Sequence, residues 1–356
     1  MTNFQELKAL CLHHNLFPLV YTRVEKYGRL FSPEKAVNDF LEESKGLYLK
    51  GVALSAQQEA VENEIVNLLT QRQIPSVVIK GNRLANEIYD DPNCRTSSDI
   101  DILIRRQDAV MADSILREHG YIAEADIPLI YCLARIHHAI YFHPQNSLLV
   151  EMHWGFGVPY FFRLDATEIW REVSIPDMGE AKLSPEMLMC MLLIHHHAHS
   201  FRELKILVDI IWTMGKYEDV IDWHSFFRGI RKAGLIRTTH ITLKQMRSVW
   251  GTAIDQVKAA GILEQEIGTA GSRIPSLLLS YFRMNIDKDR ENNLYKDKLV
   301  ARFALDHWST ILLSYFRTLF PMPEAIRELY RDRRTWSLPF NYLRFIRWRV
   351  KEWVKG

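Results

Sequence analysis

The sequence predicts an α+β protein whose strands are gathered in the middle of the chain. Helix-like apolar spacing dominates residues 1–73 and returns from residue 179 to residue 356. Short β-branched or alternating runs, which are typical of strands, lie between these parts. We therefore expect an N-terminal helical segment (1–73), a sheet-containing core with flanking helices (74–178) and a largely α-helical C-terminal domain (179–356) with a basic terminal helix.

The composition is that of a globular protein with a sizeable core. Of the 356 residues, 47% are apolar and 25% are charged, and the formal net charge is +2. A net charge this small does not indicate a nucleic-acid or membrane partner. The four cysteines have no CxxC spacing, which argues against a disulfide framework or a cysteine-only zinc site. Without a signal-peptide pattern or an apolar run of membrane-spanning length, we expect a cytoplasmic protein.

The first part of the chain contains a helix that leads to the first strand. Ser55 is a candidate N-cap, and an apolar stripe follows it over residues 60–69. Residues 76–80 then form a short β-branched run, which predicts a buried strand. This strand turns at Gly81 into a short polar helix over residues 82–89.

Three further strands are expected after this helix. Residues 99–104 alternate acidic with apolar side chains, and a surface helix over 107–119 follows them. Residues 135–143 and 148–154 are extended runs separated by a turn over 144–147, which predicts an antiparallel hairpin. Four helices are expected in the last part, over residues 184–200, 203–214, 223–233 and 238–250.

Two aspartates begin the strand at residues 99–104. Because side chains alternate along a strand, Asp99 and Asp101 point to the same face. Their carboxylates suit Mg²⁺ or Mn²⁺, and two such ions can hold the attacking and departing oxygens of a phosphoryl displacement. Glu151 is the best candidate for a third ligand, because burying an acid in an apolar strand is costly unless it has a partner. The alternative for a D-x-D motif alone is a solvated strand edge.

Lys80 and Gly81 form the turn between the first strand and its following helix. Glycine lets the backbone approach a ligand closely, and a helix N-terminus favours anions. A phosphate group can therefore bind at this turn with Lys80 as its ion partner. The alternative is an ordinary strand-to-helix turn.

Arg95 lies just ahead of the acidic strand, together with Ser97 and Ser98. A guanidinium at this place fits the need to neutralise a triphosphate, and a serine hydroxyl can contact the same group. The alternative for Arg95 is an ion pair with Asp90 or Asp91.

Two histidines of the hairpin are further candidates. With a turn over residues 144–147, His138 faces His153 across the two strands and Ile140 faces Glu151. His138 and His153 would then share the side of the sheet that carries the acidic residues, so both are candidate cofactor-binding residues.

A second group of histidines is expected on the helix over residues 184–200. His195 and His199 are four residues apart, so they share one face of that helix. The helix lacks the glutamate of an HExxH motif, which argues against a metalloprotease. The pair is either hydrogen-bonded within the core or reaches a nucleotide or a metal from the lid side. A histidine-bound zinc enzyme is a third hypothesis.

The C-terminal end of the chain is basic and aromatic. Residues 331–355 contain eight lysines or arginines and two acids. Leu343, Ile346, Val350 and Trp353 form an apolar stripe at helical spacing. A helix of this kind either contacts anionic lipid or another polyanion, or packs on its own domain with its arginines turned to solvent.

Together these stretches resemble the uncharacterised nucleotidyltransferase family, a branch of the polymerase-beta-like superfamily. The resemblance extends over about residues 60–250. The segments that carry it are VIKGNRLANEIYDDPNCRTSSDIDILI (78–104), HGY (119–121), VEMHW (150–154), LSPEMLMCMLLIHHHAHSFRELKILVDI (183–210) and IDWHSFFRGIRKAG (221–234).

The resemblance implies a small mixed sheet with helices behind it and a helical domain that closes a cleft. Asp99 and Asp101 would bind both metal ions, and Glu151 would bind the ion that activates an acceptor hydroxyl. The implied reaction moves a nucleotidyl group from a nucleoside triphosphate to a hydroxyl of a sugar, peptide, protein or nucleic acid.

Two features depart from the superfamily pattern. Lys80 and Gly81 stand where the superfamily usually has Gly-Gly or Gly-Ser, and the seventeen residues between Gly81 and Asp99 exceed the usual spacing. A catalytically silent nucleotide-binding or regulatory module with the same fold is therefore the alternative function.

Overall fold

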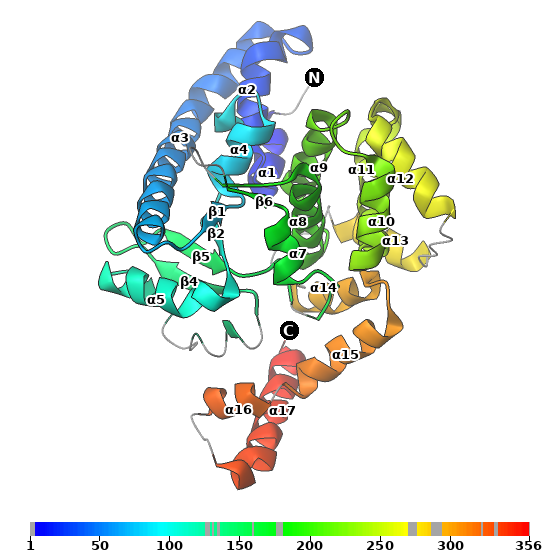
Figure 1. The fold of residues 1–356 in the computed structure, drawn as a ribbon. Helices are drawn as coiled ribbons and strands as arrows, with labels where there is room; N and C mark the ends of the chain where they lie inside the picture. Colours follow the sequence, from blue (N-terminus) through cyan, green and yellow to red (C-terminus); the bar gives the residue numbers. More distant parts are fainter. Residues whose placement is uncertain are drawn as a thin grey trace.

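A computed structural model of the chain confirms the α+β class and the small mixed sheet (Figure 1). The structure describes residues 4–124, 129, 132–133, 136–158, 160–175, 181–269, 276–285, 294–321, 323–330 and 334–355. One sheet has five strands in the order β1-β2-β5-β4-β3. Their bounds are β1 Ser76–Val78, β2 Asp99–Ile104, β3 Ile122–Ala123, β4 His138–Phe142 and β5 Leu149–His153.

The strands of this sheet pair in both parallel and antiparallel directions. β1 pairs with β2 antiparallel, β2 with β5 parallel, and β5 with β4 antiparallel. β4 and β5 form the hairpin that the sequence predicts, although Arg135, where we placed its first residue, lies outside the described residues. A second sheet of two strands, β6 (Val173–Ser174) and β7 (Lys182–Leu183), was not predicted.

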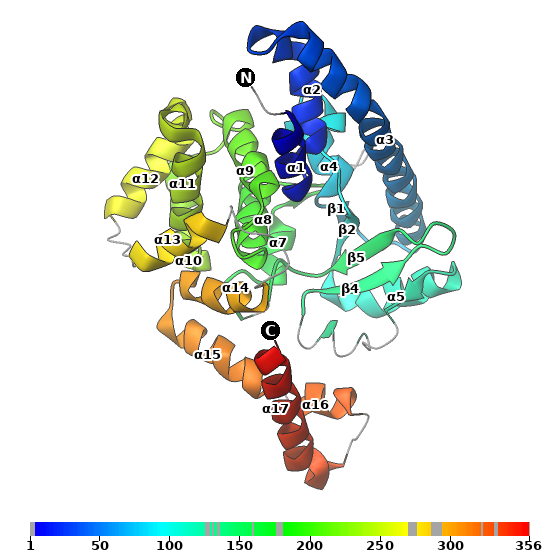
Figure 2. The ribbon, with the colours of Figure 1, turned by 180° about the vertical axis from the view of Figure 1, so that it is seen from behind.

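Three helices precede the sheet: α1 (Phe4–His13), α2 (Phe17–Tyr27) and α3 (Glu34–Gln71). α3 is 38 residues long and runs beside the sheet in Figures 1 and 2. Ser55 lies inside α3, so its prediction as an N-cap is wrong. α3 packs into one apolar cluster through Val37 and Phe40 before Ser55 and into another through Val61, Ile65 and Leu69 after it, and these tertiary contacts outweigh a local capping preference.

The central strands give the sheet two different faces. One face is apolar and packs on α3 and on α5 (Ala109–Glu118). Its main members are Ile100, Ile102, Ile104, Val150 and Met152, with Val61, Ile65 and Leu69 from α3. The other face carries Asp99 and Asp101 from β2, Glu151 and His153 from β5, and His138 from β4. The strand alternation thus separates the core from the polar residues.

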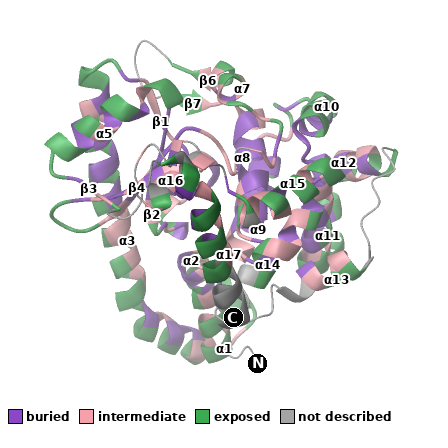
Figure 3. Cartoon of the chain, turned by 90° about the horizontal axis from the view of Figure 1, so that it is seen from below, coloured by how far each residue is buried: buried purple, intermediate pink, exposed green. Residues whose placement is uncertain are grey.

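A helical part covers the polar face of the sheet. Leu103, which lies on the same face as Asp101, belongs to an apolar cluster that includes most of α8 (Pro185–Ala198). Figure 3 shows α8 among the buried elements. Ser184 is the N-cap of this helix, and its Oγ accepts a hydrogen bond from Met187 N at 3.2 Å. The neighbouring helices are α9 (Leu204–Lys216), α10 (Trp223–Ala233), α11 (Ile236–Trp250) and α12 (Lys258–Thr269).

The last described helices are α13 (Ser276–Asn285), α14 (Leu294–Ala301), α15 (Trp308–Leu319), α16 (Pro323–Leu329) and α17 (Leu338–Lys355). In Figures 1 and 2, α16 and α17 project away from the sheet. α17 buries Phe345 and Asn341 but leaves Phe340 and Leu343 exposed. Contact of this helix with anionic lipid or a polyanion stays a prediction. Within the described part of the chain, no helix combines the length and apolarity needed to cross a membrane.

Candidate functional site

The acidic residues of the candidate site come from two neighbouring parallel strands. The register of β2 and β5 places Asp101 directly opposite Glu151. Asp99 lies two residues before Asp101 and therefore on the same face. Among the described residues, ligand atoms of Asp101, Glu151 and His153 lie within 4.8 Å of one another, and Asp99 is outside this group. The structure thus brings together two of the three predicted acids.

His153 lies between the two acids. Its Nε2 is 2.8 Å from Asp101 Oδ1 and 3.1 Å from Glu151 Oε2. Burial alone would lower the pKa of His153, but the hydrogen bonds to Asp101 and Glu151 outweigh it and raise that pKa. In the same way burial would raise the pKa of Glu151, and its contact with His153 lowers it. The three groups therefore favour a charged, hydrogen-bonded arrangement.

Lys80 supplies a second positive charge at the same carboxylate. Its Nζ lies 2.6 Å from Asp101 Oδ1, and both side chains are almost fully buried. Burial would raise the pKa of Asp101, but Lys80 and His153 hold it below its usual range. Burial would likewise lower the pKa of Lys80, and Asp101 raises it. Both groups are therefore charged at neutral pH.

Gly81 follows Lys80 and begins helix α4 (Gly81–Ile88), one residue earlier than the helix over 82–89 that the sequence predicts. Its φ is +58°, in the left-handed region that favours glycine, and a Cβ atom here would lie 3.3 Å from Glu62 Oε1. Asn82 donates to Ser55 O at 2.9 Å and to Glu62 Oε1 at 3.3 Å. The turn is therefore held against α3.

Arg95 is buried beneath this turn and pairs with Asp209 of α9. Its Nε lies 2.9 Å from Asp209 Oδ1, its Nη2 donates to Oδ2 at 3.1 Å, and its Nη1 donates to Gly81 O at 3.1 Å. The ion-pair partner is thus Asp209 and not Asp90 or Asp91. Asp209 also accepts from Tyr89 Oη at 2.7 Å. A contact of Arg95 with a triphosphate stays a prediction.

The serines ahead of β2 differ in their surroundings. Ser97 is buried, its Oγ donates to Asp99 Oδ1 at 3.0 Å, and its carbonyl accepts from Gln58 at 3.1 Å. Ser98, which we predicted as a ligand-binding residue, is exposed. Ser97 therefore positions Asp99, and Ser98 is accessible to a ligand.

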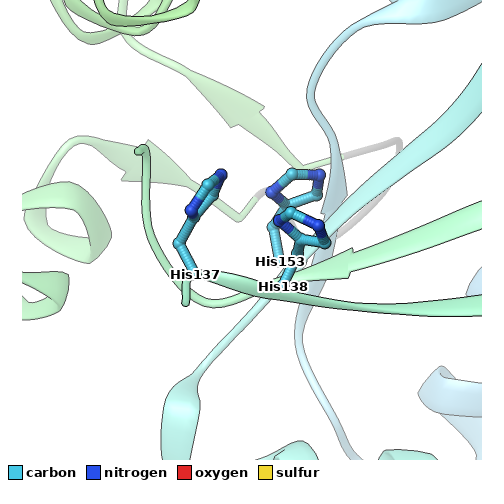
Figure 4. A group of neighbouring side chains, drawn as sticks. All are labelled: His137, His138 and His153. Carbon is cyan, nitrogen blue, oxygen red and sulfur yellow. The ribbon is translucent and has the colours of Figure 1, made fainter. Parts of the chain in front are cut away.

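The hairpin histidines form a cluster on the same side of the sheet (Figure 4). The predicted register is confirmed, because His138 pairs with His153 and Ile140 with Glu151. The structure adds His137, whose ring centroid lies 4.6 Å from that of His138 and 5.6 Å from that of His153. We missed His137 because strict alternation turns adjacent residues to opposite faces. The sequence feature that indicates this cluster is the adjacent pair of histidines, His137 and His138.

The histidines of α8, together with His199 directly after its last residue, divide into two groups. His196 and His197 are buried, and their Nε2 atoms contact Gln245 Oε1 at 2.8 Å and Ala301 O at 3.0 Å. His195 and His199 share a face as expected, with ring centroids 4.4 Å apart, and His199 Nδ1 lies 2.8 Å from Glu203 Oε1.

His195 is the member of this pair that lies within electrostatic reach of Lys80. Burial holds the pKa of His195 well below its usual range, and Lys80 and His199 lower it further. Two groups of described residues could hold a metal ion, namely Asp101, Glu151 and His153, and His137, His138 and His153; neither group includes His195 or His199. Their predicted role in ligand binding remains a prediction.

Access of a ligand to the carboxylate of Asp101 is restricted. Asp101 is 1% exposed, so a triphosphate reaches its carboxylate only if neighbouring side chains move. A cavity of about 600 Å³ lies on the α3 side of the turn and is lined by Glu62 and Asn82 among others. A second cavity of about 660 Å³ adjoins Arg105 and Trp170. Asp101 lines neither of them.

Comparison with known protein families agrees with this architecture. The model of the family described as uncharacterised nucleotidyltransferase matches residues 1–251. The chain belongs to this family. The match includes α1 to α3, so the N-terminal helices are part of the nucleotidyltransferase region, which begins earlier than the expected residue 60. No curated protein and no solved structure matches the chain.

The family indicates a nucleotidyltransferase and hence a nucleoside triphosphate as its substrate. The part of the chain after residue 251 lies outside the family match and contains α12 to α17. The candidate site residues all lie within the matched part.

Proposed function

We propose that the protein transfers a nucleotidyl group from a nucleoside triphosphate to an acceptor hydroxyl and releases pyrophosphate. The observation that carries this proposal is the parallel register in which Asp101 stands opposite Glu151, with Asp99 on the same face. Three carboxylates on one face suit divalent cations such as Mg²⁺ or Mn²⁺. The acceptor is a sugar, a peptide, a protein or a nucleic acid.

The residues at this face fit such a cation. Asp101 Oδ2 is buried and has no hydrogen-bond partner within the described part of the chain. A buried carboxylate oxygen without a partner is costly, and a cation would satisfy it. When bound, a divalent ion supplies charge stabilisation to the phosphates and to the attacking oxygen. Asp99, Asp101 and Glu151 are the residues that would hold it.

Lys80 has a separate part in this proposal. Its ammonium now lies against Asp101, and a cation bound there would compete with it for the carboxylate. Lys80 would then turn to the phosphates of the nucleotide, near the N-terminus of α4 at Gly81. Gly81 lets the backbone come close to the phosphate, because glycine has no side chain.

Two further groups would complete the nucleotide site. Ser98 is exposed at the start of β2 and can donate to a phosphate oxygen. His195 and His199 would approach the nucleotide from the helical part that covers the polar face of the sheet. In this arrangement Arg95 supports the turn through Gly81 O and Asp209.

A catalytically silent nucleotide-binding module is the second candidate. It is favoured by the burial of Asp101 and by its contacts with Lys80 and His153, which already balance its charge. Such a protein would bind a nucleotide without turning it over. The two functions differ in a single measurable property, which is release of pyrophosphate.

The experiment compares the natural protein with Asp99→Asn, Glu151→Gln and Asp101→Asn. We expect calorimetry to show Mg²⁺-dependent nucleotide binding, and mass spectrometry of candidate acceptors to show addition of a nucleotidyl group. Asp99 and Glu151 are half-buried. Asp99→Asn and Glu151→Gln should therefore abolish pyrophosphate release while the circular dichroism spectrum stays unchanged. Asp39→Asn, on the exposed face of α3, is the matched control.

The outcomes separate the hypotheses. Pyrophosphate release that survives in both Asp99→Asn and Glu151→Gln would refute the assignment of these carboxylates. Magnesium-dependent nucleotide binding without release, across triphosphates and acceptors, would support the silent module.

A further inference from the structure

The histidines of the hairpin form a group that the nucleotidyl-transfer proposal does not use. One ligand nitrogen each from His137, His138 and His153 lies within 4.8 Å of the other two. His138 begins β4, His137 immediately precedes it and His153 ends β5, and Figure 4 shows the three rings gathered at one place. Ring centroids are separated by 4.6 Å, 5.2 Å and 5.6 Å.

Two of these rings have nitrogens that the protein leaves unsatisfied. Nδ1 of His137 and Nδ1 of His138 are buried and lack a hydrogen-bond partner among the residues that the structure describes. Buried polar atoms are normally paired, and an unpaired one costs about 1–3 kcal/mol. Two neighbouring rings that each carry a buried, unpaired nitrogen point to a ligand that both rings share.

The third ring is held as metal-ligating histidines usually are. His153 Nε2 is fixed by Asp101 and Glu151 at 2.8 Å and 3.1 Å. A histidine that binds a metal through one ring nitrogen typically donates from the other to a carboxylate, which orients the ring. His153 therefore joins the imidazole group to the carboxylate pair.

We propose that His137, His138 and His153 bind a divalent transition-metal ion such as Zn²⁺, beside the carboxylates of Asp101 and Glu151. Imidazole nitrogens suit zinc and its neighbours in the first transition row, whereas Mg²⁺ takes oxygen ligands. Three protein ligands leave a fourth position open for water or a substrate atom. This inference does not depend on nucleotidyl transfer.

The present spacing is close to that of an occupied site. A tetrahedral Zn²⁺ ion with Zn–N bonds of about 2.0–2.1 Å holds its nitrogens about 3.4 Å apart. The nitrogens now lie within 4.8 Å of each other, so small rotations of the rings bring them to these distances. His138 and His153 are cross-strand partners on a paired hairpin, which fixes their backbones for this purpose.

The test uses Co²⁺ as a spectroscopic probe with full-length protein that has been stripped of metal by a chelator. We expect one equivalent of Co²⁺ to bind and to give a visible d–d absorption band of tetrahedral type, which Zn²⁺ displaces. His137→Ala and His138→Ala should each weaken Co²⁺ binding by at least about tenfold, since losing even a supporting residue costs that much. Neither substitution removes a carboxylate.

Controls keep this result specific. His224→Ala removes an exposed histidine on α10 that contacts Glu266, and it should leave the Co²⁺ band unchanged. Should an alanine variant lose its circular dichroism signal, His137→Gln or His138→Gln replaces it, because glutamine keeps much of the volume and is a poor ligand. An absent band in the natural protein, or a band that persists in the His137 and His138 variants, would overturn the proposal.

The two proposals fail in different ways. Full nucleotidyl transfer by stripped protein with Mg²⁺ alone, together with no Co²⁺ binding, would sink the transition-metal site and leave the transfer reaction standing. Specific Co²⁺ binding in a protein that transfers no nucleotide would refute the transfer reaction and leave the transition-metal site standing. Asp99→Asn should impair transfer and retain the Co²⁺ band.

Discussion

Asp101 and Glu151 face each other across two parallel strands, and His153 Nε2 lies within hydrogen-bond distance of both carboxylates. This relationship assembles a charged site before any ligand enters. Lys80 and His153 balance the two acids, so like charges on neighbouring strands do not destabilise the sheet.

Lys80 is expected to compete with divalent cations for Asp101. Replacing it in Lys80→Gln removes one positive charge 2.6 Å from Asp101 Oδ1. Affinity for Mn²⁺ should rise by roughly tenfold or more, because a unit charge at this range is worth a few kcal/mol at an intermediate dielectric constant. Titration followed by electron paramagnetic resonance measures this affinity.

Nucleotide binding should weaken in the same Lys80→Gln protein, since the phosphates lose their ion partner. Lys232→Gln is the matched control, because Lys232 forms a surface pair with Glu168 and its side chain is 77% exposed. Unchanged or weaker Mn²⁺ binding in Lys80→Gln would show that the ammonium does not occupy the cation position.

The buried pair of Arg95 and Asp209 should be a main stabilising contact between the turn and α9. In Asp209→Asn the guanidinium of Arg95 stays buried without its counter-charge, which typically costs about 3–5 kcal/mol. Urea denaturation gives this free energy of unfolding. The double variant Arg95→Met/Asp209→Leu should recover part of the loss, because it removes both charges. A loss below about 1 kcal/mol, as expected for Lys232→Ala at the surface, would contradict this role.

We expect substitution of Gly81 by alanine to destabilise the protein, and the same substitution at Gly46 to stabilise it. Gly81→Ala places a Cβ atom at a φ of +58° and 3.3 Å from Glu62 Oε1, so we expect a loss of about 1–2 kcal/mol. Gly46 lies within α3 and would meet no atom within 4 Å, so Gly46→Ala should stabilise the protein by about 0.5–1 kcal/mol. Thermal and urea unfolding of both variants check the signs. Equal effects at the two positions would rule out the conformational explanation.

Two core histidines of α8 should make the protein sensitive to acid. Burial lowers the pKa of His196 and that of His197 to about 4, below the value near 6.5 of an unfolded chain. Between these values the unfolded chain binds more protons, so stability is complete above pH 6.5 and falls as the pH drops towards 4. Each histidine contributes a slope of up to about 1.4 kcal/mol per pH unit.

His196→Gln or His197→Gln should flatten this dependence, because each removes one of the two protons that the unfolded chain takes up. Free energies of unfolding measured in urea at several pH values between 7 and 4.5 give the slope. A slope that stays the same in both variants would mean that other groups cause the acid sensitivity.

Local pattern was sufficient for most of the element order. The alternation of acidic and apolar residues in 99–104 predicted β2, and the turn at 144–147 predicted the register of β4 and β5, which is confirmed. Side chains in a paired strand repeat every two residues, so one correct turn fixes which side chains share a face. The N-cap at Ser55 is wrong because a capping preference is weak beside the tertiary contacts that α3 makes on both sides of this residue.

The sequence by itself determined the two acidic strands and the Lys80-Gly81 turn, because each depends on neighbours within a few positions. It also determined the fold class and the family resemblance, because these depend on the order of such segments along the chain. Only the tertiary structure decided which partners meet. Arg95 pairs with Asp209, more than a hundred residues away, and His137 joins His138 and His153. Long-range partners depend on how helices and strands pack, and no periodicity within a segment encodes a contact with a distant one.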